Sequence, residues 1–296
     1  MKKTILVLGA TGEFGNGIFQ SLLKYKDFEV FGTAKNDEAS LYFDSKVAAK
    51  VFNFVQIENE PKLIEIFNQI KPDVVINCVG LIKQVMGEFD APKAIFMNAL
   101  FPHKLASLCG LMGARLIHFS TDCVFSGKKG NYKEIDASDA EDVYGKTKYL
   151  GEISNLPHVI TIRTSIIGHS YDNHLQLVDW FLAQKDKTKG YTKVIYSGLP
   201  TVEMGRILAE YIIPNHRVKG LYQVSSDPIS KYDLLKLIAK EYGKKIEIEP
   251  YESAVSDRSL DSTKFRKISG YMPPTWSVLV KKMHQYYKKD KKFIQI

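Results

Sequence analysis

A tyrosine and a lysine four positions apart are the residues of this 296-residue sequence best suited to chemistry. Tyr144 and Lys148 stand in a segment that opens a predicted helix, and their spacing puts both side chains on one helix face. A phenol with an ordinary pKa of about 10 is a poor proton relay near neutral pH, but an adjacent ammonium favours its phenolate. Tyr144 can therefore exchange a proton with an oxygen that gains or loses charge beside it.

Thr121 is the third candidate for chemistry. It follows the run Arg115 to Ser120, which is predicted to be a strand, and so stands at the carboxyl end of that strand. From there its hydroxyl can donate a hydrogen bond to a carbonyl oxygen and polarise it. We therefore expect Thr121, Tyr144 and Lys148 to be the catalytic residues, although a tyrosine and lysine at this spacing also occur on ordinary surface helices.

Three glycines spaced three apart form a turn close to the start of the chain. They follow the apolar run Thr4 to Leu8 directly and lead into a segment with helical periodicity. Glycines at this spacing allow a tight turn, let a pyrophosphate approach the backbone N–H groups, and let the helix pack closely on the strand. The pattern predicts a dinucleotide-binding turn whose contacts come from Gly9, Thr11, Gly12, Glu13, Phe14 and Gly15.

Two further segments bear on the cofactor. The second predicted strand, Phe28 to Thr33, is not followed by the acidic residue with which NAD-specific proteins usually bind the ribose hydroxyls. Thr33 and Lys35 can instead bind a 2′-phosphate, which favours NADP(H). If Lys35 is an ordinary loop lysine, NAD(H) remains open as well. Four more cofactor contacts are expected after the fourth strand, at Asn77, Cys78, Val79 and Gly80.

Short aliphatic runs alternate with segments of helical period along the first part of the chain. The predicted strands are Thr4 to Leu8, Phe28 to Thr33, Val51 to Val55, Val74 to Asn77, Arg115 to Ser120 and Val159 to Arg163. Strands that are apolar throughout indicate a parallel sheet covered on both faces. The expected fold class is therefore α/β, a Rossmann-type doubly wound parallel sheet with a smaller C-terminal substrate-binding lobe. Residues 1–164 would form the NADP(H)-binding Rossmann domain that carries the catalytic residues. Residues 165–296 would form most of the lobe, interwoven with that domain.

Composition narrows the functional classes. The net charge is +8, but the lysines are spread along the chain, so nucleic-acid binding is not expected. Three cysteines without close spacing suggest neither disulfides nor a metal site. The basic N-terminus leads into an apolar run too short for a signal peptide, and no stretch approaches about 18 apolar residues. We expect a cytoplasmic protein without membrane insertion, either a monomer or a homodimer.

Together these motifs resemble the extended short-chain dehydrogenase/reductase superfamily, and within it the dTDP-4-dehydrorhamnose reductase family. The resemblance covers nearly the entire chain. The matching segments are Ser120-Thr-Asp-Cys-Val-Phe-Ser-Gly127, Tyr144-Gly-Lys-Thr-Lys-Tyr-Leu-Gly-Glu152, Arg163-Thr-Ser165, Gly198-Leu-Pro-Thr201, Gly220-Leu-Tyr-Gln-Val-Ser225, Arg258-Ser-Leu-Asp-Ser-Thr-Lys264 and Pro274-Thr-Trp276.

The resemblance implies roles for particular residues. Thr121, Tyr144 and Lys148 would be the catalytic trio, and Asn98, Tyr144 and Lys148 would also contact the cofactor. Arg258 would lie near the substrate diphosphate. The remaining candidates for substrate binding are Lys83, Asp122, Cys123, Arg163 and His169, of which Lys83 and His169 lie in loops that could equally be solvated.

Two departures from the family pattern concern the sugar. Cys123 stands where the family usually has tyrosine, and Ile166 where an aromatic residue typically faces the sugar. The Asp-Glu pair that resembles a 4,6-dehydratase is absent after Thr121. The expected reaction is NADPH-dependent reduction of the C4 ketone of a nucleotide-linked 4-keto-6-deoxy sugar, for surface polysaccharide precursors. The sugar would be of the dTDP-4-dehydrorhamnose type or a UDP-linked 2-acetamido-2,6-dideoxy-hexos-4-ulose.

Two alternatives remain open from the sequence. A nucleotide-sugar epimerase would use the same trio but retain its cofactor and return the hydride. A non-catalytic NADP-binding regulatory subunit is the other alternative, because the methionine adenosyltransferase β subunit also resembles this family.

Overall fold

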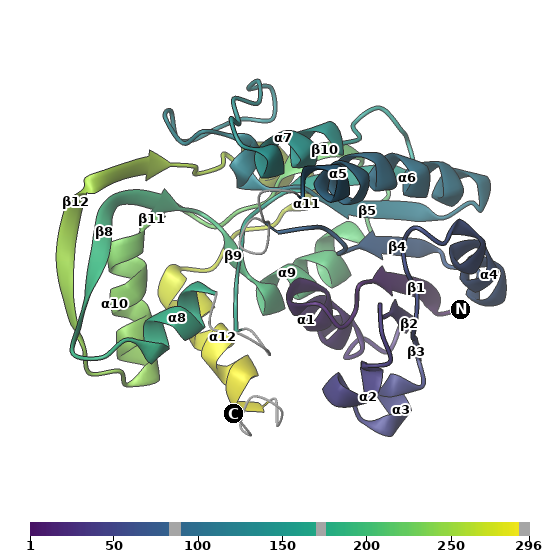
Figure 1. The fold of residues 1–296 in the computed structure, drawn as a ribbon, viewed down its shortest axis with the longest axis horizontal. Coiled ribbons are helices and arrows are strands. Elements are labelled where there is room, and N and C mark those ends of the chain that lie inside the picture. The colour runs from purple at the N-terminus through teal and green to yellow at the C-terminus, as the bar shows by residue number, and fades with distance from the viewer. Residues whose placement is uncertain (83–89, 170–175, 290–296) are drawn as a thin grey trace.

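A parallel sheet of seven strands forms the centre of the protein in a computed structural model, which describes residues 1–82, 90–169 and 176–289 (Figure 1). The strand order is β10-β6-β5-β4-β1-β2-β3. In chain order the strands are β1 (Lys3–Leu8), β2 (Phe28–Thr33), β3 (Val51–Phe52), β4 (Val74–Asn77), β5 (Arg115–Phe119), β6 (Val159–Arg163) and β10 (Gly220–Gln223). This arrangement confirms the predicted α/β class. Strand β3 is shorter than the expected Val51 to Val55, because Phe54 turns the backbone out of the strand with a φ of 58°.

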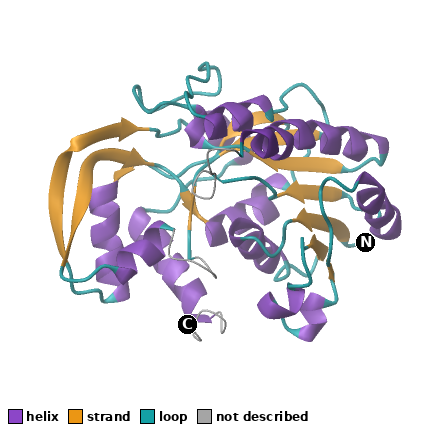
Figure 2. Cartoon of the chain, in the orientation of Figure 1, coloured by secondary structure: helices purple, strands orange, loops and turns teal. Residues whose placement is uncertain are grey.

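Helices cover both faces of this sheet, as Figure 2 shows. Along β1, Ile5 and Val7 belong to one core cluster, whereas Leu6 and Leu8 belong to the other. This alternation follows from the two-residue period of a strand. The first cluster includes side chains of α1 (Glu13–Leu22), α9 (Thr201–Ile207) and α12 (Trp276–Lys289), and the second those of α4 (Glu60–Ile70) and α6 (Phe101–Leu111). The sheet is therefore doubly wound.

One helical run bears on the question of membrane insertion. Helix α5 (Ala91–Ala94), the π-helical turn η2 (Ile95–Leu100) and α6 form a continuous stretch that is long and apolar enough to span a membrane. The apolar residues of this run are interrupted by Lys93, Asn98, His103 and Lys104, so it is not a continuous apolar stretch of the kind considered in the sequence analysis. Length and composition are weak indicators, however, and this run packs against β5 and against α7 (Val143–Leu150), as a core helix does.

The second half of the chain forms a lobe beside the sheet. Two long strands, β8 (Lys187–Tyr196) and β12 (Glu247–Asp257), pair in parallel, and the short strand β11 (Ile229–Ser230) pairs with β8. Helix α10 (Lys231–Tyr242) packs against this arm, and α8 (Leu177–Ala183) lies nearby (Figure 1). The sequence did not indicate β8 and β12, because many of their residues are exposed and polar.

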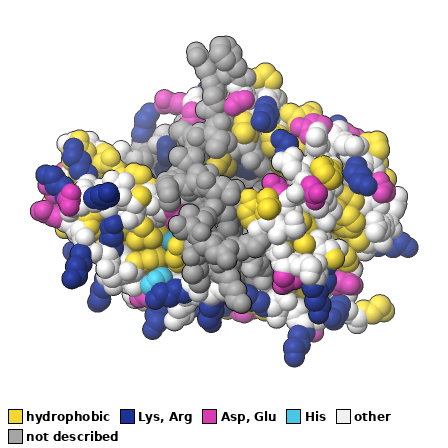
Figure 3. All heavy atoms as spheres, turned by 60° about the horizontal axis from the view of Figure 1, so that its bottom comes forward, with side chains coloured by type: hydrophobic (Ala, Val, Ile, Leu, Met, Phe, Trp, Pro, Cys, Tyr) yellow, Lys and Arg dark blue, Asp and Glu magenta, His cyan; other side chains and the backbone are white. Residues whose placement is uncertain are grey.

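The chain then returns from the lobe to the main sheet. Strand β10 adds to the edge of β6, while α9 packs on α1 and α12 packs on α9. The remaining elements are short: α2 (Ala39–Tyr42), α3 (Ser45–Ala48), η3 (Asp122–Val124), β7 (Ile166–Ile167), β9 (Leu199–Pro200), η4 (Leu208–Ile212) and α11 (Thr263–Ser269). On the face drawn in Figure 3, Lys and Arg side chains are scattered rather than gathered into one patch.

Candidate functional site

The glycine turn has the close contacts that its sequence predicts. Gly9 adopts a φ of +77°, and its carbonyl accepts a hydrogen bond of 3.1 Å from the N–H of Gly12. A Cβ on Gly15 would lie 2.0 Å from the oxygen of Gly9, so only glycine lets α1 begin this close to the turn. The turn therefore presents bare backbone to whatever lies beyond the end of β1.

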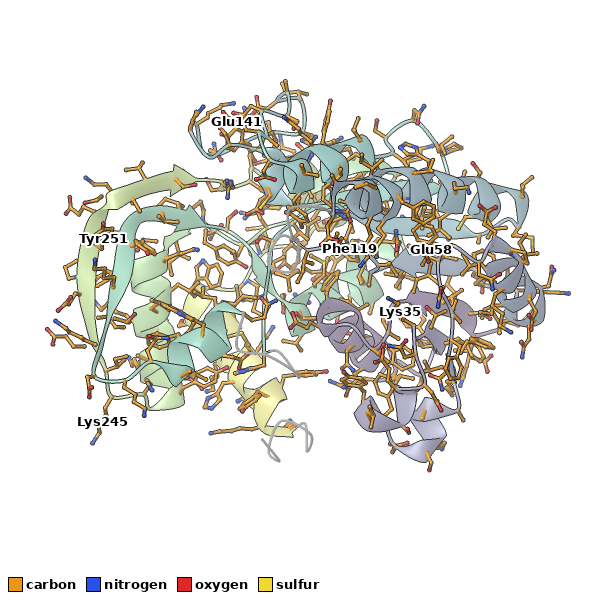
Figure 4. All side chains as sticks on the ribbon, viewed as in Figure 1. Lys35, Glu58, Phe119, Glu141, Lys245 and Tyr251 are labelled. Carbon is orange, nitrogen blue, oxygen red and sulfur yellow. The ribbon has the colours of Figure 1, made fainter. Side chains whose placement is uncertain are left out.

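A cavity of about 900 Å³ opens at the carboxyl ends of β1, β4 and β5 and is closed on its other side by the lobe. Figure 4 shows Phe119, the last residue of β5, at the centre of the molecule, where sheet and lobe meet. Most predicted site residues line this cavity: Thr11, Gly12, Glu13, Phe14, Gly15, Asn77, Cys78, Val79, Gly80, Thr121, Asp122, Cys123, Tyr144, Lys148, His169 and Arg258.

Thr121 and Tyr144 meet in this cavity. The Thr121 hydroxyl accepts a hydrogen bond of 3.1 Å from the N–H of Cys123 and can donate one of 3.2 Å to Asp122. It also hydrogen-bonds the Tyr144 phenol. The contact depends on Gly145, because a Cβ there would lie 2.3 Å from the carbonyl oxygen of Cys123. The predicted pairing of a strand end with the first turn of α7 is thus present.

The electrostatics of the phenol differ from the expectation. Burial raises the pKa of Tyr144, and the neighbouring Cys123 and Asp122 raise it further. The sequence suggested the opposite direction, because it showed the adjacent lysine but not the burial or these two groups. Without a bound cofactor Tyr144 therefore holds its proton, as a proton donor to an alkoxide must.

Lys148 is buried one helical turn after Tyr144 in α7. Its Nζ donates a hydrogen bond of 2.6 Å to the carbonyl oxygen of Phe119, at the end of β5. Burial lowers the pKa of Lys148 to about 8, and the attraction of Glu152 partly opposes that shift. The ammonium thus lies next to the carboxyl end of β5.

Glu152, which follows α7, links that helix to the ends of β5 and β6. Its carboxylate accepts a hydrogen bond of 2.7 Å from the Ser120 hydroxyl and two of 2.7 Å from the Arg163 guanidinium. The guanidinium also lies 5.0 Å from the ring centre of Phe125 and is 2 % exposed. Arg163 therefore supports the site from behind and does not line the cavity, contrary to the expectation that it meets the substrate.

Four other predicted residues also lie off the cavity lining. Gly9 shapes the turn, and the Thr33 hydroxyl accepts a hydrogen bond of 3.1 Å from its N–H. The Asn98 side chain is buried and binds both the N–H and the carbonyl of Leu81, at 2.9 and 3.0 Å, so it positions the loop after β4. Lys35 is exposed on the sheet half of the molecule (Figure 4). Lys83 lies outside the described residues.

His169 lies at the cavity but is held by neighbouring side chains. Its Nδ1 is 2.5 Å from a carboxylate oxygen of Asp179, and its Nε2 is 2.8 Å from the Tyr242 hydroxyl. The ring also stacks on Tyr287 at 3.8 Å. Because both ring nitrogens are engaged, His169 anchors the cavity wall to α8, α10 and α12.

Lys231 is a site residue that the sequence analysis missed. It opens α10, lines the cavity opposite the trio and is largely buried, which lowers its pKa. Asp122 attracts it, and Arg258, whose Nε donates 2.9 Å to the carbonyl of Phe125, repels it. Asp122 is itself buried, and burial raises its pKa against the attraction of Arg258. A basic pair therefore faces the cavity beside a single carboxylate.

Nothing local in the sequence indicated Lys231, which is one of many lysines spread along the chain. Trp180, Tyr196 and Ser256 also line the lobe side and also went unnoticed. Within the described ranges, no three His, Cys, Asp or Glu side chains come together as a metal site requires.

Comparison with known proteins gives a match along almost the whole chain. Residues 1–289 match the family described as RmlD substrate binding domain. A dTDP-4-dehydrorhamnose reductase from Aggregatibacter actinomycetemcomitans is 27 % identical, with 95 % of this chain and 98 % of that protein covered. The methionine adenosyltransferase 2 subunit beta of Danio rerio is 23 % identical, with 81 % and 74 % covered.

The fold also matches solved structures. A dTDP-4-dehydrorhamnose reductase from Bacillus anthracis, crystallised in complex with NADP, superposes with a TM-score of 0.78 at 20 % identity. The superposition covers 97 % of this chain and 99 % of that chain. At this identity the likeness concerns the fold.

Proposed function

Because the chain belongs to the RmlD substrate binding domain family, we propose that it reduces a keto group of a nucleotide-linked sugar, with NADPH or NADH as the hydride donor. The observation that carries this proposal is the meeting of Thr121, Tyr144 and Lys148 in the cavity that the glycine turn borders. Each of these groups has a distinct task in reducing a ketone, and no one of them would suffice alone.

The cavity fits a nicotinamide dinucleotide at its sheet side. The backbone N–H groups after Gly9, at the start of α1, suit a pyrophosphate. Gly80 keeps the space beside Lys148 open, since a Cβ there would lie 3.8 Å from Nζ and 3.2 Å from the Asn98 oxygen. When bound, the cofactor supplies the hydride. The protein's own groups then orient it and handle the proton.

The proton chemistry falls to the trio. Thr121 donates a hydrogen bond to the ketone oxygen and polarises it. Tyr144, which burial keeps protonated, gives its proton to the alkoxide as that oxygen gains charge. Lys148 stabilises the resulting phenolate through its ammonium and is held in place by the carbonyl of Phe119. Because a hydroxyl has one proton, Thr121 releases its 3.2 Å hydrogen bond to Asp122 when it donates to the ketone.

The lobe side suits the nucleotide-linked part of a sugar nucleotide. Lys231 and Arg258 provide two cations for a diphosphate, which free sugars lack. Cys123, Ile166 and Ile82 give the region near the trio small and apolar surfaces, which suit the C6 methyl of a deoxy sugar. We therefore propose the C4 ketone of a dTDP- or UDP-linked 4-keto-6-deoxy sugar as the substrate, in the synthesis of surface polysaccharide precursors.

The test follows NADPH and NADH absorbance with the purified protein and 4-keto-6-deoxy sugar nucleotides generated in situ, in dTDP and UDP forms. The expected result is stoichiometric oxidation by the wild type and a loss of about 10²- to 10⁴-fold in Tyr144→Phe. Conversion of the sugar without net cofactor oxidation would identify an epimerase instead.

A regulatory subunit is the second candidate, because the chain also matches a methionine adenosyltransferase β subunit. It predicts tight dinucleotide binding, no turnover of any ketosugar, and an obligatory enzyme partner. Turnover that depends on Tyr144 would exclude this candidate.

A further inference from the structure

Glu38 lies against the glycine turn, although it stands well after the end of β2. The Thr11 hydroxyl, within the turn, donates a hydrogen bond of 2.9 Å to its carboxylate. Thr11 lines the cavity. Glu38 directly precedes α2, and its side chain is half-buried. No acidic residue directly follows Thr33 in the sequence, but the fold brings the Glu38 carboxylate to the turn from five residues farther along the chain.

The loop that carries Glu38 is fixed to its surroundings on both sides. The N–H of Ala10 donates 2.8 Å to the carbonyl of Thr33, and the N–H of Val55 donates 2.9 Å to the carbonyl of Ala34. The neighbouring Asp37 accepts a hydrogen bond of 2.8 Å from the Asn53 side chain. The position of the Glu38 carboxylate is therefore a property of the fold.

The position of Glu38 puts a negative charge near the place where the adenosine ribose of a bound dinucleotide would lie. In a fold of this class the glycine turn holds the pyrophosphate, and the adenosine ribose lies toward the end of the second strand. A carboxylate there accepts hydrogen bonds from ribose hydroxyls. A 2′-phosphate, which carries roughly two negative charges, would be repelled by Glu38. Lys35, the cation that could offset this repulsion, is exposed on the same loop.

We propose that Glu38, held by Thr11, reads the 2′ position of the adenosine ribose and makes the protein favour NAD(H) over NADP(H). The inference rests on the proposed function for the presence of a dinucleotide, and it concerns the choice between the two cofactors that the proposed function leaves open. It assigns a specificity-determining role to a residue outside the glycine motif and outside the trio.

The test measures binding and does not require turnover. Isothermal titration of the whole protein with NAD⁺ and NADP⁺, and with 5′-AMP and adenosine 2′,5′-bisphosphate, gives the affinity ratio within each pair. The wild type is expected to bind the members without a 2′-phosphate more tightly. Glu38→Gln, which keeps a hydrogen-bonding group for Thr11, is expected to shift both ratios at least about tenfold toward the 2′-phosphate, because a charge pair of this kind is worth about 1.4 kcal/mol or more.

Asp37→Asn is the matched control, since it removes the same charge from the neighbouring residue, whose carboxylate is bound to Asn53. It is expected to leave both ratios within about twofold. The proposal is overturned if Glu38→Gln leaves the ratios unchanged, weakens both ligands of a pair equally, or shifts them no more than Asp37→Asn does. A wild-type preference for NADP⁺ that Lys35→Met abolishes would also overturn it, in favour of Lys35.

The outcomes also separate this inference from the proposed function. A shifted ratio in a protein that reduces no ketosugar would support the role of Glu38 and count against the reductase. Failure of the wild type to bind either dinucleotide would overturn both.

Discussion

The cavity has two walls that are assembled differently. The wall that carries Thr121, Tyr144 and Lys148, which we call the sheet wall, comes from the ends of adjacent parallel strands and from the first turns of α7. The opposite wall, the lobe wall, carries Lys231 and Arg258 from α10 and from the end of β12, elements that meet only through the fold of the lobe.

The two walls also differ in how their charges are satisfied. Behind the sheet wall, Glu152 joins Ser120 and Arg163 in buried hydrogen bonds, which fix the strand ends before any ligand arrives. On the lobe wall, Lys231 and Arg258 face the cavity with Asp122 as the carboxylate that attracts them both. The sheet wall is thus preorganised for chemistry. On the lobe wall, the two cations share one carboxylate, and an anionic ligand would supply the additional negative charge.

Removing the cation behind the sheet wall should have the largest effect on stability. Arg163→Met leaves the Glu152 carboxylate buried without its bidentate partner, which costs about 3–5 kcal/mol. Chemical denaturation of the variant measures this loss. The exposed pair of Lys187 and Glu249 on the lobe arm is the control, and Lys187→Met should leave the free energy of unfolding nearly unchanged. Equal losses would contradict the contrast between the walls.

Removing the Thr121 hydroxyl should affect turnover rather than cofactor binding. Thr121→Val deletes the donor that polarises the ketone, and kcat/KM should fall by about 10²- to 10³-fold. The dinucleotide Kd should stay within about twofold, because the hydroxyl is placed for the ketone oxygen. Thr164→Val makes the same change elsewhere in the cavity lining and serves as the control. Undiminished turnover in Thr121→Val would remove this residue from the mechanism.

Changing the lobe wall should alter substrate affinity. Lys231→Met removes a buried cation opposite a diphosphate, and KM for the sugar nucleotide should rise by about 10- to 100-fold at nearly constant kcat. Lys240→Met, on the exposed side of the same helix, should leave KM unchanged. If Lys231→Met lowers kcat and leaves KM unchanged, the two walls do not divide chemistry and binding as described.

The smallest expected effect is a pH dependence from Lys148. Because burial lowers its pKa to about 8, its ammonium is present below that pH and is lost above it. Dinucleotide affinity should therefore decline by up to about tenfold as the pH rises from 7 to 9. Lys148→Met should bind more weakly at pH 7 and show no decline. A decline that persists in this variant would assign the titration to another group.

The sequence predicted correctly those features that depend on residues close together in the chain. All strands of the seven-strand sheet except β10 were predicted from the sequence, because they are largely buried and form plain apolar runs. Strands β8 and β12 were missed because they are half-exposed and polar, which leaves a weak pattern. The trio was found because a strand end and a helix spacing are local features.

For two residues, the contacts expected from the sequence differ from those in the structure. Arg163 was expected at the substrate, yet it lies behind the cavity, because a buried carboxylate competes for a guanidinium more strongly than an open site does. Asn98 was expected to contact the cofactor, but its side chain forms hydrogen bonds with the N–H and the carbonyl of Leu81. In neither case does the sequence near the residue show the partner.

The sequence by itself determined the glycine turn, the parallel sheet and the Thr121, Tyr144 and Lys148 constellation, because backbone geometry and short-range periodicity dictate them. Only the tertiary structure placed Lys231 beside Asp122, Arg163 on Glu152 and Glu38 on Thr11. Those pairs join residues from separate elements, and their charges and pKa values depend on burial, which arises only when the whole chain packs.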